Sequence, residues 1–291
     1  MTNRKRNSVF HIHPLLFGLF FLAFITGSFM EMIIIFTIVV IHEFGHLSMA
    51  LFFRWRIRKV MFWPFGGVME TDDYFSRPNR EELYVVLAGP VQHIWIHFFL
   101  IYSNGFGLLS PDLIQFAVHY NIVLLLFNLI PIYPLDGGKL CFLLFSQFLP
   151  FQKAMDWTII FSVMTVIIGL SLAIMEGWGT LHTVLLAIFL LLENRIEWNR
   201  RKFVFIRHLM ARQNRTNYEG YKMLKNKLPP HITVYRTLSG LRKGCYHQFV
   251  IPVGERLVTV DEQSCLDAYF NQQQPNIPMG SIAKWQDKTE R

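Results

Sequence analysis

The sequence predicts an all-α polytopic membrane domain, followed by a small α/β domain at the C-terminal end. Of the 291 residues 52% are hydrophobic and only 16% are charged, which is little charge for a soluble protein and ordinary for a membrane protein. The apolar residues also gather in six runs, each near the roughly 20 residues that a helix needs to cross a bilayer. A buried core helix would explain one or two such runs but not six. The runs cover about residues 13–30, 32–53, 84–103, 113–130, 158–175 and 179–192.

The positions of the basic residues predict the orientation of these six transmembrane helices. Lys and Arg concentrate on the cytoplasmic side of membrane helices. If the N-terminus is cytosolic, all 28 Lys and Arg residues fall in cytosolic segments, and the three outer turns, near Glu31, Asp112 and Glu176, contain none. We therefore expect an integral, multi-pass membrane protein with both its N- and its C-terminus in the cytosol.

The net charge of +8 comes from the region after the last apolar run. Residues 193–291 carry 17 basic and 9 acidic side chains, beginning with Arg195, Arg200 and Arg201. A surface for nucleic acid would also be basic, but attraction to an anionic lipid bilayer explains a cluster at this place more simply. The expected partner of these residues is the membrane, with no direct contact to nucleic acid.

The C-terminal region combines helical and strand patterns. Residues 194–215 predict a helix that leaves the membrane, and a polar tail from Asn271 predicts a loose end. Short apolar segments predict strands at 232–236, 248–253 and 256–260 and a helix at 262–270. The predicted domains are a membrane domain at 1–195, a linker helix at 196–225 and a cytosolic domain at 226–291.

The segment of residues 62–69, between the second and third runs, is too short to cross the bilayer and too apolar for a water-exposed loop. We expect it to dip toward the membrane as a hairpin or a re-entrant loop, in which Gly66 and Gly67 allow the turn. The alternative is an interfacial anchor formed by the aromatic side chains of Trp63 and Phe65.

The strongest indication of chemistry is His42-Glu43-Phe44-Gly45-His46, near the middle of the second run. Positions i and i+4 of a helix lie on one face, so both imidazoles can reach one zinc ion while Glu43 lies beside it. Ionisable residues inside a membrane helix are costly and therefore indicate a partner or a function. Polar packing between helices is the alternative interpretation.

A catalytic zinc ion needs a third protein ligand and one open position. Asp136 is the candidate, because it is a carboxylate in an apolar stretch after the fourth run. Pro131 and Pro134 would interrupt the helix there and let Asp136 turn inward. The alternative is that Asp136 caps a helix at the membrane edge.

Other histidines also have spacings that suit a metal. His93 and His97 are four residues apart in the third run, and His11 and His13 lie near the N-terminus. No glutamate accompanies them and no third ligand is evident. Packing or hydrogen bonding between helices is therefore the favoured interpretation of these histidines.

The motif at His42–His46, together with Asn128 and Pro134-Leu-Asp-Gly137, resembles the paired signature of the site-2 protease family of intramembrane metalloproteases. Ala88-Gly89-Pro90 is similar to a motif in the third span of that family, whose pattern continues to an asparagine where this chain has His93. The length, the six runs and the small C-terminal domain are most similar to the sporulation branch of the family. The resemblance runs along nearly the whole chain.

This resemblance implies a site-2 protease core with one Zn²⁺ ion per chain and Glu43 as the base that activates water. The metal would be held by His42, His46 and Asp136. The implied substrate-binding residues include Asn128, which would hydrogen-bond an extended substrate backbone, and Phe65, which would cover the metal cleft. The others are Pro134, Gly66 and Gly67.

The resemblance also implies a substrate, partners and a location. The substrate would be the inactive, membrane-associated precursor of a sporulation sigma factor of the pro-sigma-K type, processed by regulated intramembrane proteolysis. Membrane-bound inhibitory proteins of the sporulation complex and a second copy of the chain are the implied partners, in the forespore outer membrane facing the mother cell. The C-terminal domain resembles a cystathionine-β-synthase (CBS-like) regulatory module, which implies ATP as a ligand.

Two other functions compete with proteolysis. A membrane metal carrier would use the same intramembrane histidines, and a non-catalytic scaffold would only hold partner membrane proteins. The presence of Glu43 favours the protease, because transport needs metal ligands but no general base.

Overall fold

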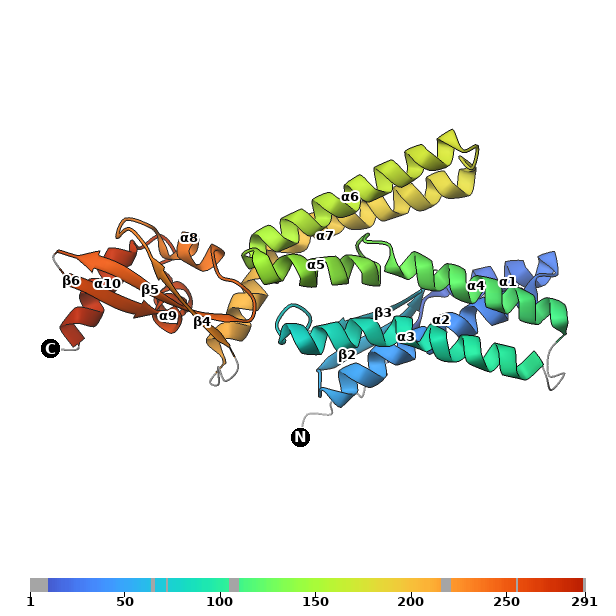
Figure 1. Ribbon diagram of the computed structural model, residues 1–291, viewed down its shortest axis with the longest axis horizontal. Coiled ribbons are helices and arrows are strands. Elements are labelled where there is room, and N and C mark those ends of the chain that lie inside the picture. Colours follow the sequence, from blue (N-terminus) through green and yellow to red (C-terminus); the bar gives the residue numbers. More distant parts are fainter. Residues whose placement is uncertain are drawn as a thin grey trace. The chain divides into compact units, whose positions relative to one another are not determined.

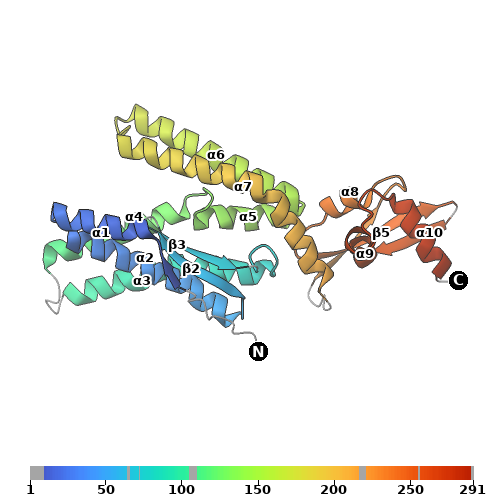
Figure 2. The ribbon, with the colours of Figure 1, turned by 180° about the vertical axis from the view of Figure 1, so that it is seen from behind.

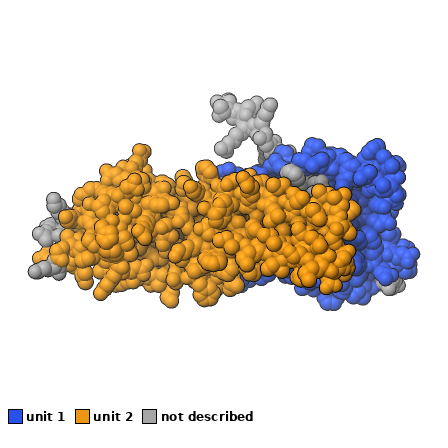
Figure 3. All heavy atoms as spheres, turned by 90° about the horizontal axis from the view of Figure 1, so that it is seen from above, with its two compact units in different colours: residues 1–131, 135–140 blue, residues 132–134, 141–291 orange. Residues whose placement is uncertain are grey.

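The computed structural model describes residues 10–63, 66–71, 73–104, 110–215, 221–254 and 256–289. The chain divides into two compact units, shown in different colours in Figure 3. The first unit contains Met1–Pro131 and Leu135–Leu140, and the second contains Ile132–Pro134 and Cys141–Arg291. The boundary between the two units lies between residues 131 and 141, whereas we expect the membrane domain to end at residue 195. The three domain ranges given above stay a prediction.

The first unit is built on three long helices that pack alongside one another, α2, α3 and α4 (Figure 1). Their shared core contains Ile38 of α2, Ile96 of α3 and Ala117 of α4. A Cβ atom at Gly45 would overlap the carbonyl of Ala88, so glycine lets α2 approach the backbone of α3 closely. The helices of this unit are α1 (Pro14–Thr26), α2 (Phe29–Phe52), α3 (Asn79–Asn104), α4 (Pro111–Leu129) and the first turn of α5 (Asp136–Phe148).

A three-stranded sheet lies within the same unit. Strand β1 (Phe10–Ile12) is parallel to β2 (Ile57–Trp63), and β2 is antiparallel to β3 (Gly66–Thr71). The strands β2 and β3 form the expected hairpin, and its approach to the membrane stays a prediction. Gly66 and Gly67, which we expect to allow the turn, are the first two residues of β3 and pair with Trp63 and Phe62 of β2, while residues 64 and 65 lie outside the described residues.

Four helices are long and apolar enough to cross a membrane, namely α2, α3, α4 and α6 (Phe151–Met175). Helix α1 is also apolar but has 13 residues, and the sixth apolar run lies in α7 (Leu181–Gln213). All six predicted runs thus coincide with helices. The number of six spans goes beyond the four that length and composition support, and it stays a prediction.

In the second unit, α6 and α7 run side by side as a helical hairpin, which both ribbon views show (Figures 1 and 2). Helix α7 is continuous over 33 residues and includes nearly all of the predicted helix at 194–215. The amide of Phe151 donates to the carbonyl of Leu241, and the Phe151 ring stacks on His208 at 4.1 Å between ring centroids. These contacts join the start of α6 to the C-terminal part of the chain and to the later part of α7.

The C-terminal part is a small mixed α/β fold. Its sheet has the order β4-β5-β6, with β4 parallel to β5 and β5 antiparallel to β6. The predicted strands at 248–253 and 256–260 and the helix at 262–270 are confirmed. The elements are β4 (Lys222–Lys227), α8 (Val234–Ser239), β5 (Cys245–Val253), β6 (Arg256–Asp261), α9 (Glu262–Phe270) and α10 (Met279–Thr289).

Two predictions for this part are wrong. The predicted strand at 232–236 overlaps the start of α8, because the Thr233 hydroxyl caps that helix by accepting from the amide of Arg236. The tail after Asn271 is not loose, because it contains α10. Met279, Ile282 and Ala283 are buried, and their i, i+3, i+4 spacing gives α10 an apolar face.

A buried ion pair joins the end of α7 to α9. The Arg212 guanidinium donates to both oxygens of Glu262, with distances of 2.5 and 2.7 Å, and to the carbonyls of Arg242 and Cys245. The backbone amide of His247 also donates to Glu262, at 3.1 Å. Arg212 is 3% exposed and Glu262 is fully buried, so the pair ties helix and domain together away from water.

Candidate metal centre

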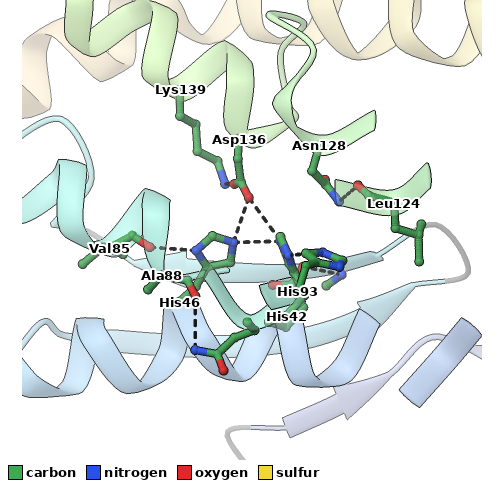
Figure 4. A network of polar contacts seen from close by, with 12 residues as sticks. His42, His46, Val85, Ala88, His93, Leu124, Asn128, Asp136 and Lys139 are labelled. Carbon is green, nitrogen blue, oxygen red and sulfur yellow. Dashed lines mark hydrogen bonds and ion pairs between the residues drawn. The ribbon is translucent and has the colours of Figure 1, made fainter. Parts of the chain in front are cut away.

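Helix α2 presents two imidazoles on one face at the middle of its length. His42 and His46 are one turn apart, are buried, and their Nε2 atoms are 3.0 Å apart (Figure 4). Gly89 of α3 lies directly against both rings, because a Cβ atom there would be 2.5 Å from Cε1 of His46 and 2.8 Å from Cε1 of His42. The glycine in the Ala88-Gly89-Pro90 motif therefore makes room for the histidine pair.

Asp136 reaches the same point from α5. Helix α4 ends at Leu129 and Ile130 has an extended backbone, as expected for a residue that precedes a proline. Helix α5 then begins at Asp136 itself. A Cβ atom at Gly137 would overlap the carbonyls of Leu129 and Ile130, so glycine lets the first turn of α5 lie against the end of α4.

The Oδ2 atom of Asp136 is 3.1 Å from Nε2 of His42 and 3.0 Å from Nε2 of His46. Asp136 is 3% exposed, and among the described residues this Oδ2 atom has no hydrogen-bond partner. We call these three residues the metal triad. A buried carboxylate oxygen without a donor, facing two imidazole nitrogens, is an arrangement that a cation would stabilise.

The spacing of the metal triad fits zinc. Zinc bonds to imidazole nitrogen and carboxylate oxygen are about 2.0–2.2 Å long, so tetrahedral ligand atoms lie roughly 3.3 Å apart. The three ligand atoms here are 3.0 to 3.1 Å apart. Three ligands of this type leave one position of a tetrahedral zinc ion for water or substrate. Their role as metal ligands stays a prediction.

Further polar contacts surround the metal triad. Nδ1 of His46 lies 2.7 Å from the carbonyl of Val85, and Nδ1 of His42 lies 3.0 Å from Nε2 of His93 (Figure 4). His93 in turn contacts Asn121 of α4. The Lys139 ammonium group donates to Oδ1 of Asp136 at 3.0 Å. Oδ1 of Asp136 thus has a hydrogen-bond donor, whereas Oδ2 faces the two imidazoles.

Glu43 lies next to the metal triad in sequence and contacts the β2–β3 hairpin. The amide of Gly67 donates to Oε1 of Glu43 at 3.0 Å. A Cβ atom at Gly67 would be 2.5 to 2.9 Å from three side-chain atoms of Glu43. Glycine at this position of β3 therefore lets the hairpin backbone lie directly on the carboxylate.

For the expected substrate-binding residues, the structure shows no polar contact with the metal triad among the described residues. The Asn128 amide group donates to the carbonyl of Leu124 in its own helix (Figure 4). Pro134 follows a cis peptide bond and belongs to the second unit. Gly66 begins β3, and Phe65 lies outside the described residues. Their contact with a substrate stays a prediction.

Part of the surroundings of the metal triad is not marked by any motif in the sequence. Hydrogen bonding between helices, the favoured interpretation of His93, is confirmed, because its ring contacts His42 of α2 and Asn121 of α4; the sequence did not identify these two partners. Asn121 and Lys139 were not singled out. An asparagine inside an apolar run is itself a signal, since an amide in a membrane helix needs partners. A lysine three residues after a buried aspartate in a helix is a second such signal.

Comparison with known proteins adds independent findings. The family model described as peptidase family M50 matches residues 30–111 and 107–172. The chain is 35% identical over 280 residues to stage IV sporulation protein FB of Bacillus subtilis, which covers 94% of this chain and 95% of that protein. It is also 35% identical over 116 residues to zinc metalloprotease MJ0392 of Methanocaldococcus jannaschii, covering 37% of this chain and 32% of that protein.

The fold is similar to that of a solved structure. The site-2 protease from Methanocaldococcus jannaschii matches with a TM-score of 0.53 and 24% sequence identity. The match covers 66% of this chain and 92% of that protein. At this level of identity the similarity concerns the fold alone.

Proposed function

Because the chain belongs to peptidase family M50, the site-2 protease family, and is a metalloprotease, we propose that it hydrolyses a peptide bond of a membrane-associated protein precursor. The observation that carries the proposal is the convergence of His42, His46 and Asp136 from two separate segments, with their ligand atoms 3.0 to 3.1 Å apart. The set fits one zinc ion per chain.

The residues around the metal triad have separate roles in this mechanism. A bound zinc ion supplies Lewis acidity toward a peptide carbonyl and acidifies a water molecule. Glu43 would take a proton from the water that attacks the peptide carbonyl carbon and would give it to the amine nitrogen, which leaves as the C–N bond breaks. Gly67 orients the Glu43 carboxylate through its amide, and Lys139 orients Asp136. Asn128 hydrogen-bonds the backbone of an extended substrate, since the peptide bonds of a helix are already hydrogen-bonded.

The substrate that we propose is an inactive sporulation sigma factor precursor of the pro-sigma-K type. The support is the similarity over nearly the whole chain to a stage IV sporulation protein. By the same similarity, the protein would act in the forespore outer membrane, facing the mother cell, with inhibitory membrane proteins as partners. Six spans with both termini cytosolic agree with the placement of the basic residues.

The C-terminal domain is proposed to be a CBS-like regulatory module. Its β-α-β-β-α order, from β4 to α9, supports this assignment. ATP is the ligand that the resemblance implies. Titration of the full-length protein with ATP tests it, and a lack of saturable binding would remove the nucleotide from the proposal.

Replacing Glu43 tests the proposed function most directly. Co-expression of the Glu43→Gln variant with a candidate precursor should abolish cleavage, while the purified variant keeps its zinc, because the metal ligands are untouched. Glu31→Gln, in the first turn of the same helix, is the matched control and should cleave normally. Unaltered cleavage by Glu43→Gln would reject the assigned base. Zinc binding without any proteolysis by the wild type would favour a metal carrier.

Asn128→Ala tests the substrate contact. We expect weaker cleavage with unchanged zinc content, because the side chain donates to Leu124 and not to the metal triad. The measurement is the cleaved fraction of the precursor beside the zinc content of the purified protein. A loss of zinc in this variant would contradict the assigned role.

A further inference from the structure

A chain of polar side chains leads from the metal triad across three helices. It begins at His42 of α2, continues through His93 of α3 and ends at Asn121 of α4. The three side chains are 4%, 1% and 2% exposed, respectively. Polar groups buried this deeply are costly unless each donor meets an acceptor. The positions of their hydrogen atoms can therefore be worked out from the partners.

The starting point is the backbone carbonyl of His93, which can only accept. Nδ2 of Asn121 lies 2.9 Å from this carbonyl, so the NH₂ group of the amide must face it. Oδ1 of Asn121 then faces Nδ1 of His93 at 2.8 Å. An amide oxygen also only accepts, so the proton of the neutral His93 ring is on Nδ1.

The proton on His93 also determines the tautomer of His42 in the metal triad. With its proton on Nδ1, His93 has a bare Nε2 atom, which lies 3.0 Å from Nδ1 of His42. His42 must therefore be the donor, with its own proton on Nδ1. Its Nε2 lone pair is then free and faces Oδ2 of Asp136. The reverse tautomer would place a hydrogen atom on Nε2, where a metal ion would bind.

The two histidines of the metal triad differ in how their tautomers are fixed. Nδ1 of His46 faces the backbone carbonyl of Val85 at 2.7 Å, and a substitution of the Val85 side chain would not remove that carbonyl. The tautomer of His42 depends on two side chains, His93 and Asn121. Substitution can therefore disturb His42 alone, which makes the effect testable.

We propose that His93 and Asn121 are positioning residues that hold His42 in the metal-binding tautomer and ring orientation, so that they set the zinc affinity of the site. The inference rests on the proposed function, since it takes the metal triad to bind zinc. Hydrogen-bond partners of metal-binding histidines typically change metal affinity about 10–100-fold when they are removed.

The test measures zinc affinity of the full-length protein, purified in detergent, by competition with a chromogenic chelator. His93→Leu removes the acceptor and should weaken zinc binding about 10–100-fold. His93→Gln keeps an acceptor for His42 and a donor for Asn121, and should bind zinc much more tightly than His93→Leu. His97→Leu, one turn along the same helix and outside the chain of contacts, is the matched control and should bind as the wild type does.

Asn121 provides a second, independent comparison. Asn121→Leu should weaken zinc binding about tenfold, at the lower end of the range for such partners. In a His93→Leu background the same change should have no further effect, because Asn121 acts through His93. A merely structural role would instead give additive losses and no recovery in His93→Gln.

The outcomes separate the inference from the function on which it rests. If the wild type binds no zinc, the proposed function fails at its ligands. If the wild type binds zinc and both His93→Leu and Asn121→Leu bind it equally tightly, the function survives and the positioning role is overturned. Should His93→Leu fail to fold, the affinities of Asn121→Leu and His93→Gln still decide the question.

Discussion

Gly89→Ala is the substitution whose effect on the metal centre follows most directly from the structure. The new methyl carbon would lie 2.5 Å from Cε1 of His46 and 2.8 Å from Cε1 of His42, and it would be closer still to Nε2 of His46. Carbon atoms in contact are normally about 3.5–4.0 Å apart. One or both imidazoles must therefore move by roughly 1 Å.

A shift of the imidazoles by this distance is too large for the metal site to keep its geometry. Metal–ligand distances are held within about 0.2 Å, and a misplacement of 1 Å can cost about 100-fold in rate. Outward movement of α3 by the same distance would relieve the overlap only by opening the core that Ile96 shares with Ile38 of α2. We expect Gly89→Ala to lower cleavage about 100-fold or more and to reduce the zinc content.

The assay is cleavage of a co-expressed precursor, together with the zinc content of the purified variant. Gly169→Ala is the matched control, because Gly169 also lies in a long apolar helix, α6, and nothing lies within 4 Å of its added Cβ atom. The control should cleave and bind zinc as the wild type does. Gly89→Ala protein with a full complement of zinc and near-normal cleavage would refute the reasoning.

Two further substitutions test other contacts. Gly67→Ala should slow cleavage strongly while zinc is retained, because the methyl group of the new alanine would displace the Glu43 carboxylate. Normal cleavage of the precursor by this variant would contradict the prediction. Burial opposes the charge of Glu262, but hydrogen bonds from His247 and the charge of Arg212 outweigh it and hold the pKa of Glu262 below its ordinary value. The stabilisation from its charge is complete above the unfolded pKa of about 4.5 and is lost as pH falls through the lower folded pKa. Glu262→Gln should therefore destabilise the C-terminal domain by about 3–5 kcal/mol at neutral pH. In denaturant unfolding, the difference in stability between the variant and the wild type should shrink below about pH 4. A difference that does not change with pH would count against the ion pair.

The sequence predicts the helices of the first unit well because a long apolar run has few alternatives to a helix. The hairpin at 62–69 is one of three expected forms, because the composition of this segment does not distinguish a hairpin from a re-entrant loop or an interfacial anchor. Ile232 and Val234 suggested a strand, but the position of Thr233 as a helix cap decides the local structure. Strand β4, Lys222–Lys227, is mostly exposed and lysine-rich, so no apolar alternation marks it.

The residues of the candidate metal centre also differ in how far the sequence identifies them. His42, Glu43 and His46 are recognisable because their chemistry depends on spacing along one helix. Asp136 was found by its chemical type and its setting, although its distance from the histidines required the fold. His93 could not be interpreted alone, because spacing relates it to His97, whereas its contact is with a residue 51 positions away.

The continuity of α7 has a mechanical consequence. Its 33 residues form one uninterrupted helix with a contour length of roughly 50 Å, and it contains no proline. Its C-terminal turn is clamped by the ion pair between Arg212 and Glu262, and Phe151 fastens the neighbouring helix to the same region. A displacement of the β4–β6 sheet would therefore act directly on the backbone of α7, because no loop separates the clamped turn from the part of the helix that packs on α6.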